Sequence, residues 1–268
     1  MKIVTWNVNS LKAREEFFLQ FVDKEAPDVL CLQELKQETH AVKREMFESR
    51  GYEVSVFGQK QWNGVLIASK SPITDVKTGL EGYDAGQSRI ISATINNIRI
   101  INLYCPQGQS EESEKYKYKL KFYDGLIKRL GLEMKGNPNL VVTGDFNIAP
   151  EPCDVYWDTI EKPSVVTHHP LELQKWKEMI ELGLVEVGRQ FIPEGGFTFW
   201  DYRAFWDFQS RKFRYDKGMR IDHFVLSSHL VPYVENVEVY RGWRRNRGKI
   251  KASDHAPVFL ELREESLD

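Results

Sequence analysis

Cysteine is scarce in this chain of 268 residues, with three copies, Cys31, Cys105 and Cys153, spread far apart. Such spacing argues against a zinc site or a disulfide framework and suits a reducing compartment. Long apolar runs are also missing, and none approaches the ~20 residues of a membrane-spanning helix. The chain begins Met-Lys-Ile-Val-Thr-Trp, without the apolar core of a secretory signal. We therefore expect an intracellular, cytoplasmic protein with no membrane partner.

The sequence also lacks a linker rich in Pro, Gly or Ser, a low-complexity tract and an internal repeat. Its composition, 41% hydrophobic, 12% aromatic and 28% charged, is that of an ordinary globular protein. The length lies at the upper end for one α/β domain and allows a large core. These features predict a single domain over residues 1–268.

Charge is distributed unevenly, although the net charge is only −2. Residues 201–255 hold twelve Lys and Arg against seven Asp and Glu, a local charge of +5, which leaves −7 for the rest. This asymmetry predicts a basic face for a polyanion. A solvated surface with no such function is the alternative.

Residue patterns predict an α/β fold of two packed sheets with helices outside, because the helices do not alternate regularly with the strands. Helical periodicity is found at Glu15–Glu25, Val42–Arg50, Lys117–Leu130 and Leu171–Leu182. Gly51 and Gly183 follow two of these segments, where left-handed C-caps are expected. Short apolar, β-branched runs predict ten strands, at Lys2–Trp6, Val29–Gln33, Tyr52–Phe57, Val65–Ser69, Ile90–Ile95, Ile98–Tyr104, Leu140–Thr143, Ile221–Leu226, Val234–Val239 and Pro257–Leu262.

Polar side chains gather where these predicted strands begin or end. They are Asn7, Asn9, Glu34, Asp145, Asn147, Asp222, Asp254 and His255. Each alone could complete a turn, cap a loop or pair with a surface charge. Together, their hard oxygen donors suit Mg²⁺ or Mn²⁺ rather than zinc. Such a set with a histidine indicates metal-assisted hydrolysis of a phosphate ester, with a carboxylate as general base.

Seven motifs then resemble, in order and over the whole chain, those of the exonuclease III family of apurinic/apyrimidinic endonucleases, in the endonuclease/exonuclease/phosphatase superfamily. One motif alone is weak, whereas seven in order are specific. They are Trp6-Asn7-Val8-Asn9-Ser10-Leu11-Lys12-Ala13-Arg14, Cys31-Leu32-Gln33-Glu34-Leu35-Lys36, Tyr104-Cys105-Pro106-Gln107-Gly108, Gly144-Asp145-Phe146-Asn147-Ile148-Ala149-Pro150, Phe197-Thr198-Phe199-Trp200-Asp201-Tyr202-Arg203, Gly218-Met219-Arg220-Ile221-Asp222 and Ser253-Asp254-His255-Ala256-Pro257-Val258.

The resemblance implies a DNase I-like fold, a four-layered α/β sandwich whose two mixed sheets are flanked by helices. It implies a Mg²⁺-dependent DNA repair nuclease, with Mn²⁺ as substitute, that cuts the phosphodiester bond 5′ to abasic sites. Exonuclease activity from 3′ to 5′ and 3′-phosphatase or 3′-repair diesterase activity would accompany it. The partner would be double-stranded DNA with abasic sites or blocked 3′ ends, and the protein a monomer.

The resemblance also implies residue roles. Glu34 would be the principal metal ligand, with Asn7 and Asp254 supporting it and with Asp145, Asn147 and His255 at the same centre. Asp145 would activate the attacking water, Asn147 and His255 would contact the phosphate, Asp222 would orient His255, and Tyr104 would lie against the phosphate. Backbone contacts to DNA would come from Asn9, Lys36, Arg89 and Gln107. Phe199, Trp200 and Met219 would receive the extruded sugar, with ordinary core packing as the alternative.

Three departures from the family pattern and two rivals qualify this interpretation. Cys105 replaces a frequent Phe, and Met219 stands where Leu or Trp is often seen, which affects the fit of the sugar pocket. Ser10 stands where the family often has Gly, which affects a turn but removes no ligand. Secreted DNases, inositol-polyphosphate phosphatases and neutral sphingomyelinases share the acidic set but not all of the motifs. A catalytically inert DNA-binding module is the rival from another class, and the presence of Glu34, Asp145, Asp222 and His255 disfavours it.

Overall fold

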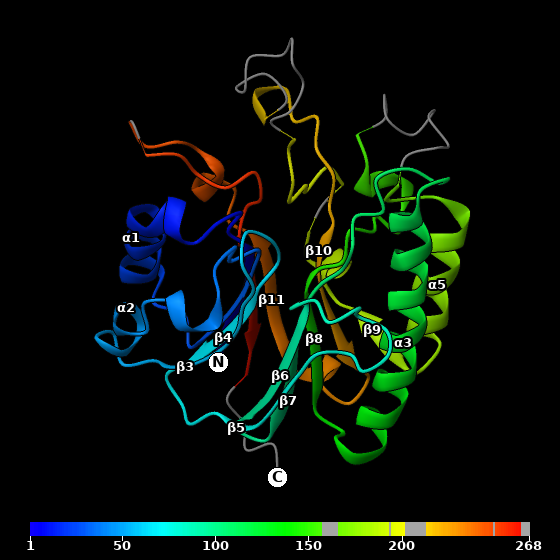
Figure 1. Cartoon of the computed structure of the whole chain (residues 1–268), viewed down its shortest axis with the longest axis horizontal. Helices are drawn as coiled ribbons and strands as arrows, with labels where there is room; N and C mark the ends of the chain where they lie inside the picture. Colours follow the sequence, from blue (N-terminus) through cyan, green and yellow to red (C-terminus); the bar gives the residue numbers. More distant parts are fainter. Residues whose placement is uncertain (157–165, 193, 202–212, 249, 264–268) are drawn as a thin grey trace.

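The computed structural model describes residues 1–156, 166–192, 194–201, 213–248 and 250–263. Two six-stranded sheets pack face to face, and helices cover their outer faces (Figure 1). The described residues thus form the predicted four-layered α/β sandwich, and they contain no helix long and apolar enough to cross a membrane.

The first sheet contains the N-terminal strand. Its order is β11-β12-β1-β2-β4-β3. β1 and β2 are parallel and the other neighbours are antiparallel, so the sheet is mixed. The strands are β1 (Lys2–Asn7), β2 (Val29–Gln33), β3 (Glu53–Phe57), β4 (Val65–Ser69), β11 (Val234–Val239) and β12 (Val258–Leu262).

The second sheet repeats this plan with the order β5-β6-β7-β8-β10-β9. Here β7 and β8 are the parallel pair in an otherwise antiparallel sheet. The strands are β5 (Thr74–Thr78), β6 (Ile90–Ile95), β7 (Ile98–Tyr104), β8 (Leu140–Asp145), β9 (Leu184–Glu186) and β10 (Asp222–Ser227).

Helices form the two outer layers. α1 (Glu15–Glu25) and α2 (Glu45–Glu48) lie beside the first sheet, and α3 (Glu114–Gly136) and α5 (Pro170–Ile180) beside the second (Figure 1). Single turns of 3-10 helix also occur, at Lys12–Arg14, Thr39–Ala41, Pro152–Asp154, Gly188–Gln190, Val231–Tyr233 and Arg241–Arg244.

The predicted elements agree with this arrangement except at polar edges. α1 has the predicted bounds, and Gly51 and Gly183 have the expected positive φ angles of 79° and 96°. The helix predicted at Val42–Arg50 is wrong in length, since only one turn, α2, is α-helical. β5 was not predicted because all its residues are exposed and show no apolar alternation. β9, with three residues, is too short to produce a pattern.

Alternating side chains divide the core into layers. On β1, Ile3 belongs to the cluster between the sheets, whereas Val4 packs with Phe17 and Phe21 of α1. On the other side, Ile101 of β7 belongs to the cluster formed with α3 and α5. Each sheet therefore buries both of its faces, which accounts for the continuous apolar runs in the central strands.

A polar contact crosses the apolar layer between the sheets. Asn102 of β7 donates to the backbone oxygens of Leu32 and Leu66 in the opposite sheet, at 2.9 and 2.8 Å. Gln33 donates to Asn102 Oδ1 at 2.7 Å and to Thr5 Oγ1 at 2.9 Å. Gln33, Asn102 and Thr5 are fully buried. These directional bonds fix the position of one sheet against the other.

Gly144 permits the close approach of β7 and β8 immediately before Asp145. Its φ of 138° is one that other residues rarely adopt. A Cβ at this position would lie 2.0 Å from the backbone oxygen of Leu103, its partner in the strand pairing. The backbone itself leaves no room for a side chain there.

We expect Gly144→Ala to lower the free energy of unfolding by roughly 3 kcal/mol or more, because the strands must separate to accept the methyl group. Thermal denaturation should show a Tm lower by about 10 °C for a chain of this size. Gly136→Ala is the control, since a Cβ there meets nothing within 4 Å. Equal Tm values for both variants would contradict this account.

Candidate active site

Strand pairing brings the predicted polar residues to one end of the sandwich. In the second sheet, Asp145 is paired with Tyr104 on one side and with Asp222 on the other. In the first sheet, Asn7 and Gln33 are paired at the ends of β1 and β2, so Glu34 follows at the same edge. The site is therefore assembled from both sheets.

Asn7 is fully buried and links two carboxylates that come from different sheets. Its Nδ2 donates to Glu34 Oε1 at 2.9 Å and to Asp145 Oδ2 at 3.0 Å. Its Oδ1 accepts from the Asn9 backbone N–H at 3.0 Å. One amide thus holds Glu34 and Asp145 close together.

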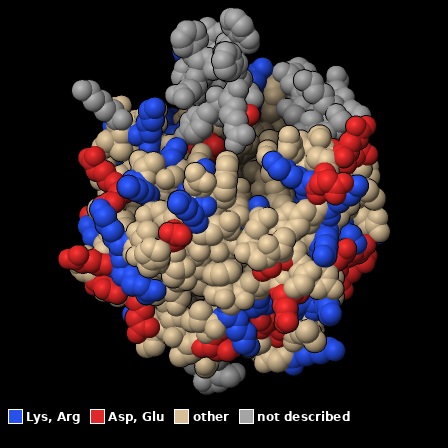
Figure 2. All heavy atoms as spheres, viewed as in Figure 1, with Lys and Arg blue, Asp and Glu red and all other residues tan. Residues whose placement is uncertain are grey.

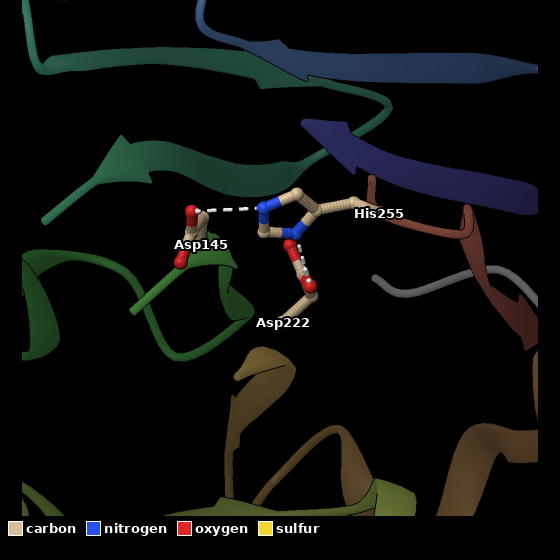
Figure 3. A group of neighbouring side chains, drawn as sticks. All are labelled: Asp145, Asp222 and His255. Carbon is tan, nitrogen blue, oxygen red and sulfur yellow. Dashed lines mark hydrogen bonds and ion pairs between the residues drawn. The ribbon is translucent and has the colours of Figure 1, made fainter. Parts of the chain in front are cut away.

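His255 lies between the two aspartates of β8 and β10, as Figure 3 shows. Its Nδ1 is 2.9 Å from Asp222 Oδ2, and its Nε2 is 3.8 Å from Asp145 Oδ2. Trp6 Nε1 donates to the His255 carbonyl at 3.1 Å, which fixes the backbone as well. Because Asp222 holds Nδ1, Nε2 is directed toward Asp145 and the cavity.

Lys36 connects Glu34 to a second amide at the rim. Its Nζ lies 2.8 Å from Glu34 Oε2 and 2.5 Å from Asn9 Oδ1. Asn9 Nδ2 in turn donates to Asp254 Oδ1 at 2.8 Å. The predicted ligand Asp254 is therefore connected to Glu34 by polar contacts through Asn9 and Lys36.

Several site residues have left-handed backbone conformations, which are uncommon outside glycine. Glu34 has φ 53° and Asn147 has φ 51°. Ser10 has φ 85°. The family named above often has Gly at this position, so the turn keeps the conformation that Gly favours. Such backbone strain is typical of functional loops that the surrounding structure over-determines.

Tyr104 and Arg89 form a stacked pair beside Glu34. The Arg89 guanidinium lies 4.9 Å from the centre of the Tyr104 ring, and its Nη1 donates to the Tyr104 carbonyl at 3.1 Å. Burial, with the charge of Glu34, holds the pKa of Tyr104 well above its usual range. Tyr104 is therefore a neutral phenol, able to donate a hydrogen bond.

The crowded charges shift the pKa values of the central groups. Burial raises the pKa of Asp145 to about 7, and the nearby charge of Asp222 adds to the rise. Burial alone would lower the pKa of His255, but the charges of Asp222 and Asp145 raise it to about 10. Burial likewise opposes ionisation of Glu34, yet Lys36 holds the pKa of Glu34 below its usual value.

Most of the predicted site residues line one open cavity. Those in its wall are Asn9, Glu34, Lys36, Tyr104, Gln107, Asp145, Asn147, Phe199, Met219, Asp254 and His255. Asn7 and Asp222 lie behind this wall and act on it through their hydrogen bonds, while Arg89 lies under Tyr104. Sequence reasoning missed Val166 and Thr167, which also line the cavity but belong to no motif.

Trp200 lies apart from the cavity wall that contains the other residues of the predicted sugar pocket. Its side chain is fully buried, with its ring 4.9 Å from that of Phe213 and its Nε1 donating to Asp216 at 3.2 Å. It does not line the cavity, so the alternative of core packing describes it. Phe199 lies 4.8 Å from the His255 ring and, with Met219, keeps the predicted position in the wall.

The basic segment over residues 201–255 is only partly a surface feature. Arg203, Arg211, Lys212 and Lys249 lie outside the described residues. Arg220 and Arg244 are buried, and Arg220 pairs with Asp154 and Glu186. Arg214, Lys217, Arg245, Arg247 and Lys251 are exposed. On the face in Figure 2, the positive and negative side chains are interspersed. Among the described bases, Arg220 and Arg244 therefore do not belong to an exposed basic face.

The donor set fits a hard divalent cation. Glu34 and Asp145 each place a carboxylate oxygen within 3.0 Å of the same Asn7 nitrogen, and both line the cavity. Asp145, Asp222 and His255 also lie close enough together, within 4.8 Å, to hold an ion. A protonated imidazole, however, has no lone pair for a metal. We therefore favour the carboxylate oxygens of Glu34 and Asp145 over the predicted ligands His255 and Asn7, since Asn7 turns its Nδ2 and not its Oδ1 toward these carboxylates.

Comparison with known proteins identifies the class. The chain belongs to the endonuclease/exonuclease/phosphatase family, which matches residues 4–255. A relative named exodeoxyribonuclease III from Haemophilus influenzae is 32% identical over 98% of this chain and 100% of its own length.

Two solved structures are similar over the whole fold. One is a Neisseria 3′ phosphatase, NExo, bound to a product DNA hairpin, with a TM-score of 0.90, 36% identity and coverage of 98% of this chain and 99% of that one. The other is an AP endonuclease from Archaeoglobus fulgidus, with a TM-score of 0.89, 33% identity and the same coverage. The resemblance found in the motifs is thereby confirmed.

We expect Glu34→Gln to weaken binding of Mn²⁺, because one anionic oxygen is lost beside Asp145. Isothermal titration calorimetry should show a Kd higher by about tenfold or more. Glu38→Gln is the matched control, since this half-exposed acid follows the same strand and does not line the cavity. An unchanged Kd in Glu34→Gln would remove Glu34 from the ligand set.

Asp222→Asn should lower the pKa of His255 from about 10 toward its ordinary value of 6.5, because Asp222 is the carboxylate on Nδ1. An NMR titration of the imidazole resonances measures this directly, with His255→Gln to assign the signal. A His255 pKa that stays near 10 would show that another group holds its proton.

Proposed function

We propose that the protein is a Mg²⁺-dependent phosphodiester hydrolase that repairs duplex DNA. It cuts 5′ to abasic sites and also acts at 3′ ends, as a 3′→5′ exonuclease and as a 3′-phosphatase or 3′-repair diesterase. The observation that carries this proposal is that Glu34, Asp145 and His255 line one open cavity, with Asp222 holding His255 and Asn7 holding the two carboxylates from behind.

Asp145 is suited to be the general base that positions and activates water. Its pKa of about 7 lies close to neutral pH, where a base is effective. Asn7 and the backbone N–H of Asn147 each donate to one of its oxygens, at 3.0 and 2.9 Å, which fixes the carboxylate plane. A water bound to Asp145 would thus face a phosphate held in the cavity.

His255, Tyr104 and Asn147 are suited to hold the phosphate. The His255 imidazolium and the Tyr104 phenol both donate hydrogen bonds, and charge-assisted donors are the stronger ones. A cation on Glu34 and Asp145 would polarise the phosphoryl oxygen and stabilise the charge that develops there. Lys36 holds Glu34 ionised for that task.

Substrate recognition is proposed at the cavity wall and rim. Phe199 and Met219 present an apolar surface next to His255, suited to a sugar without its base. Asn9, Gln107 and Arg89 would contact the backbone, and Lys217 adds a positive charge in the wall. Relatives named for a 3′ phosphatase and for an AP endonuclease support both substrate types.

We further propose that the chain works as a single-domain monomer in the cytoplasm. Its three cysteines are free thiols and two of them are buried, which suits a reducing compartment. Sedimentation of the purified protein tests the monomer. A stable dimer at micromolar concentration would contradict it.

Three labelled duplexes test the proposed function in Mg²⁺ and in EDTA. One has a single tetrahydrofuran abasic analogue, one a 3′-phosphate and one is intact. Incision 5′ to the analogue, release of phosphate and shortening from the 3′ end, all lost in EDTA, would support the three activities separately. No reaction on any duplex would favour an inert DNA-binding protein or a relative that acts on RNA, inositol phosphates or lipids.

Asp145→Asn should lower kcat on the reactive duplexes by about 10³-fold or more, because the amide cannot accept a proton from water. DNA affinity, measured by fluorescence anisotropy, should stay within a few fold. Turnover at the wild-type rate would exclude Asp145 as the base.

A further inference from the structure

Three consecutive carbonyls that follow Asp145 are each held by a different buried side chain. Tyr123 donates to the Phe146 oxygen at 2.5 Å, and Lys119 Nζ donates to the Asn147 oxygen at 2.8 Å. The imidazole of His223 lies 2.8 Å from the Ile148 oxygen. Lys119 and Tyr123 belong to α3, whereas His223 belongs to β10. The outer helix therefore reaches the backbone of the active-site loop.

Lys119 is the unusual member of this group, because its side chain has no exposed surface. Its Nζ also lies 2.7 Å from Glu172 Oε1 of α5, a carboxylate that is equally buried. Within the described part of the chain, Glu172 Oε2 has no hydrogen-bond partner. The pair is thus taken out of water with incomplete compensation.

Burial of such a pair gains little stability over apolar side chains of the same size. A stabilising role therefore does not account for a charged group at this place in the fold. The strong directional bond that an ammonium group makes to a carbonyl oxygen is what an apolar side chain cannot supply. In this structure, that oxygen belongs to Asn147.

Asn147 connects this bond to the reacting groups. Its backbone has the left-handed φ of 51°, its N–H donates to Asp145 Oδ1 at 2.9 Å, and its Nδ2 donates to the Cys105 oxygen at 2.9 Å. The Asn147 oxygen is on the 147–148 peptide and the Asn147 N–H is on the 146–147 peptide, and the two peptides meet at the Asn147 Cα. A displacement of the 147–148 peptide that moves this Cα would redirect the Asn147 side chain and the N–H that holds Asp145. Because small misplacements of catalytic groups strongly reduce the rate, this peptide needs a fixed orientation.

We propose that Lys119, held by Glu172, is a positioning residue that fixes the Asn147 peptide and through it Asp145 and Asn147. The role extends the active site to α3 and α5, two helices that contribute no group to the cavity wall. The positioning role rests on the proposed function where its effect is measured as the rate of DNA hydrolysis.

The test compares Lys119→Met with the double variant Lys119→Met/Glu172→Met. The single variant leaves Glu172 buried without its partner and should lose Tm. The double variant removes the unpaired buried carboxylate and should recover most of the lost stability, although the Asn147 oxygen stays without its donor. It should still lose about tenfold or more in kcat on the abasic or 3′-phosphate duplex, with KM changed by less than about threefold.

Lys175→Met is the matched control. Lys175 also connects the two helices, with its Nζ 2.9 Å from Asp124 of α3. Its side chain is partly exposed, and its ion pairs are with Asp124 and Glu178 rather than with the active-site loop. Its loss should leave kcat and KM unchanged. A fall in kcat for Lys175→Met equal to that of the double variant would indicate general loosening of the helices and would overturn the proposal.

Hydrogen–deuterium exchange gives a readout that does not depend on catalysis. Amides of residues 145–149 should exchange faster in the double variant than in the wild type, while those of β7 and β10 stay protected. If the wild type fails on every DNA duplex, the proposed function fails and this exchange still tests the positioning role. If a stable double variant shows the wild-type exchange rates at residues 145–149 or the wild-type kcat, Lys119 and Glu172 have only a structural role and the proposal is overturned.

Discussion

Three carboxylates enclosed at one end of two packed sheets are the constraint on which the site depends. Glu34, Asp145 and Asp222 meet where water is largely excluded, and buried like charges repel strongly. Hydrogen-bonding side chains of the protein, rather than water, offset this repulsion. Asn7 donates to two of the carboxylates, and His255 lies between the aspartates. The remaining excess of negative charge suits the cation that we propose for this cavity.

The positions of these groups could be predicted because each follows or precedes a run of apolar, β-branched residues. Such a run defines a strand, and a carboxylate directly after it has to lie at the edge of the sheet. Asp145 at the end of β8 and Glu34 directly after β2 are examples. The layers were predictable as well, since strands apolar on both faces need cover on both sides. Family motifs then supplied roles that position alone does not give.

What stayed beyond prediction depends on which side chains become buried. Arg220 counts toward the predicted basic face, and no feature of the sequence marks Lys119 as buried, yet the fold encloses both in ion pairs with distant acids. Trp200 occurs in a motif beside Phe199, but alternate residues of an extended segment point to opposite sides, and only Phe199 reaches the cavity. β5 has no buried face, so no apolar pattern marked it. These outcomes are set by contacts between segments far apart in the chain.

The hydrogen bonds of Asn102 across the two sheets have a consequence for how the site tolerates change elsewhere. Apolar faces attract without preferred direction, so two sheets held by dispersion alone can slide over each other as core side chains change in size. The hydrogen bonds of Asn102 instead fix the two sheets to each other at one point, near the end of the sandwich that carries Gln33 and Glu34. Changes in the distant core would then rotate one sheet against the other about this fixed point. The distances between groups from opposite sheets, such as Asn7 and Asp145, would then drift least of all, and the apolar core could diverge while the chemistry stayed the same.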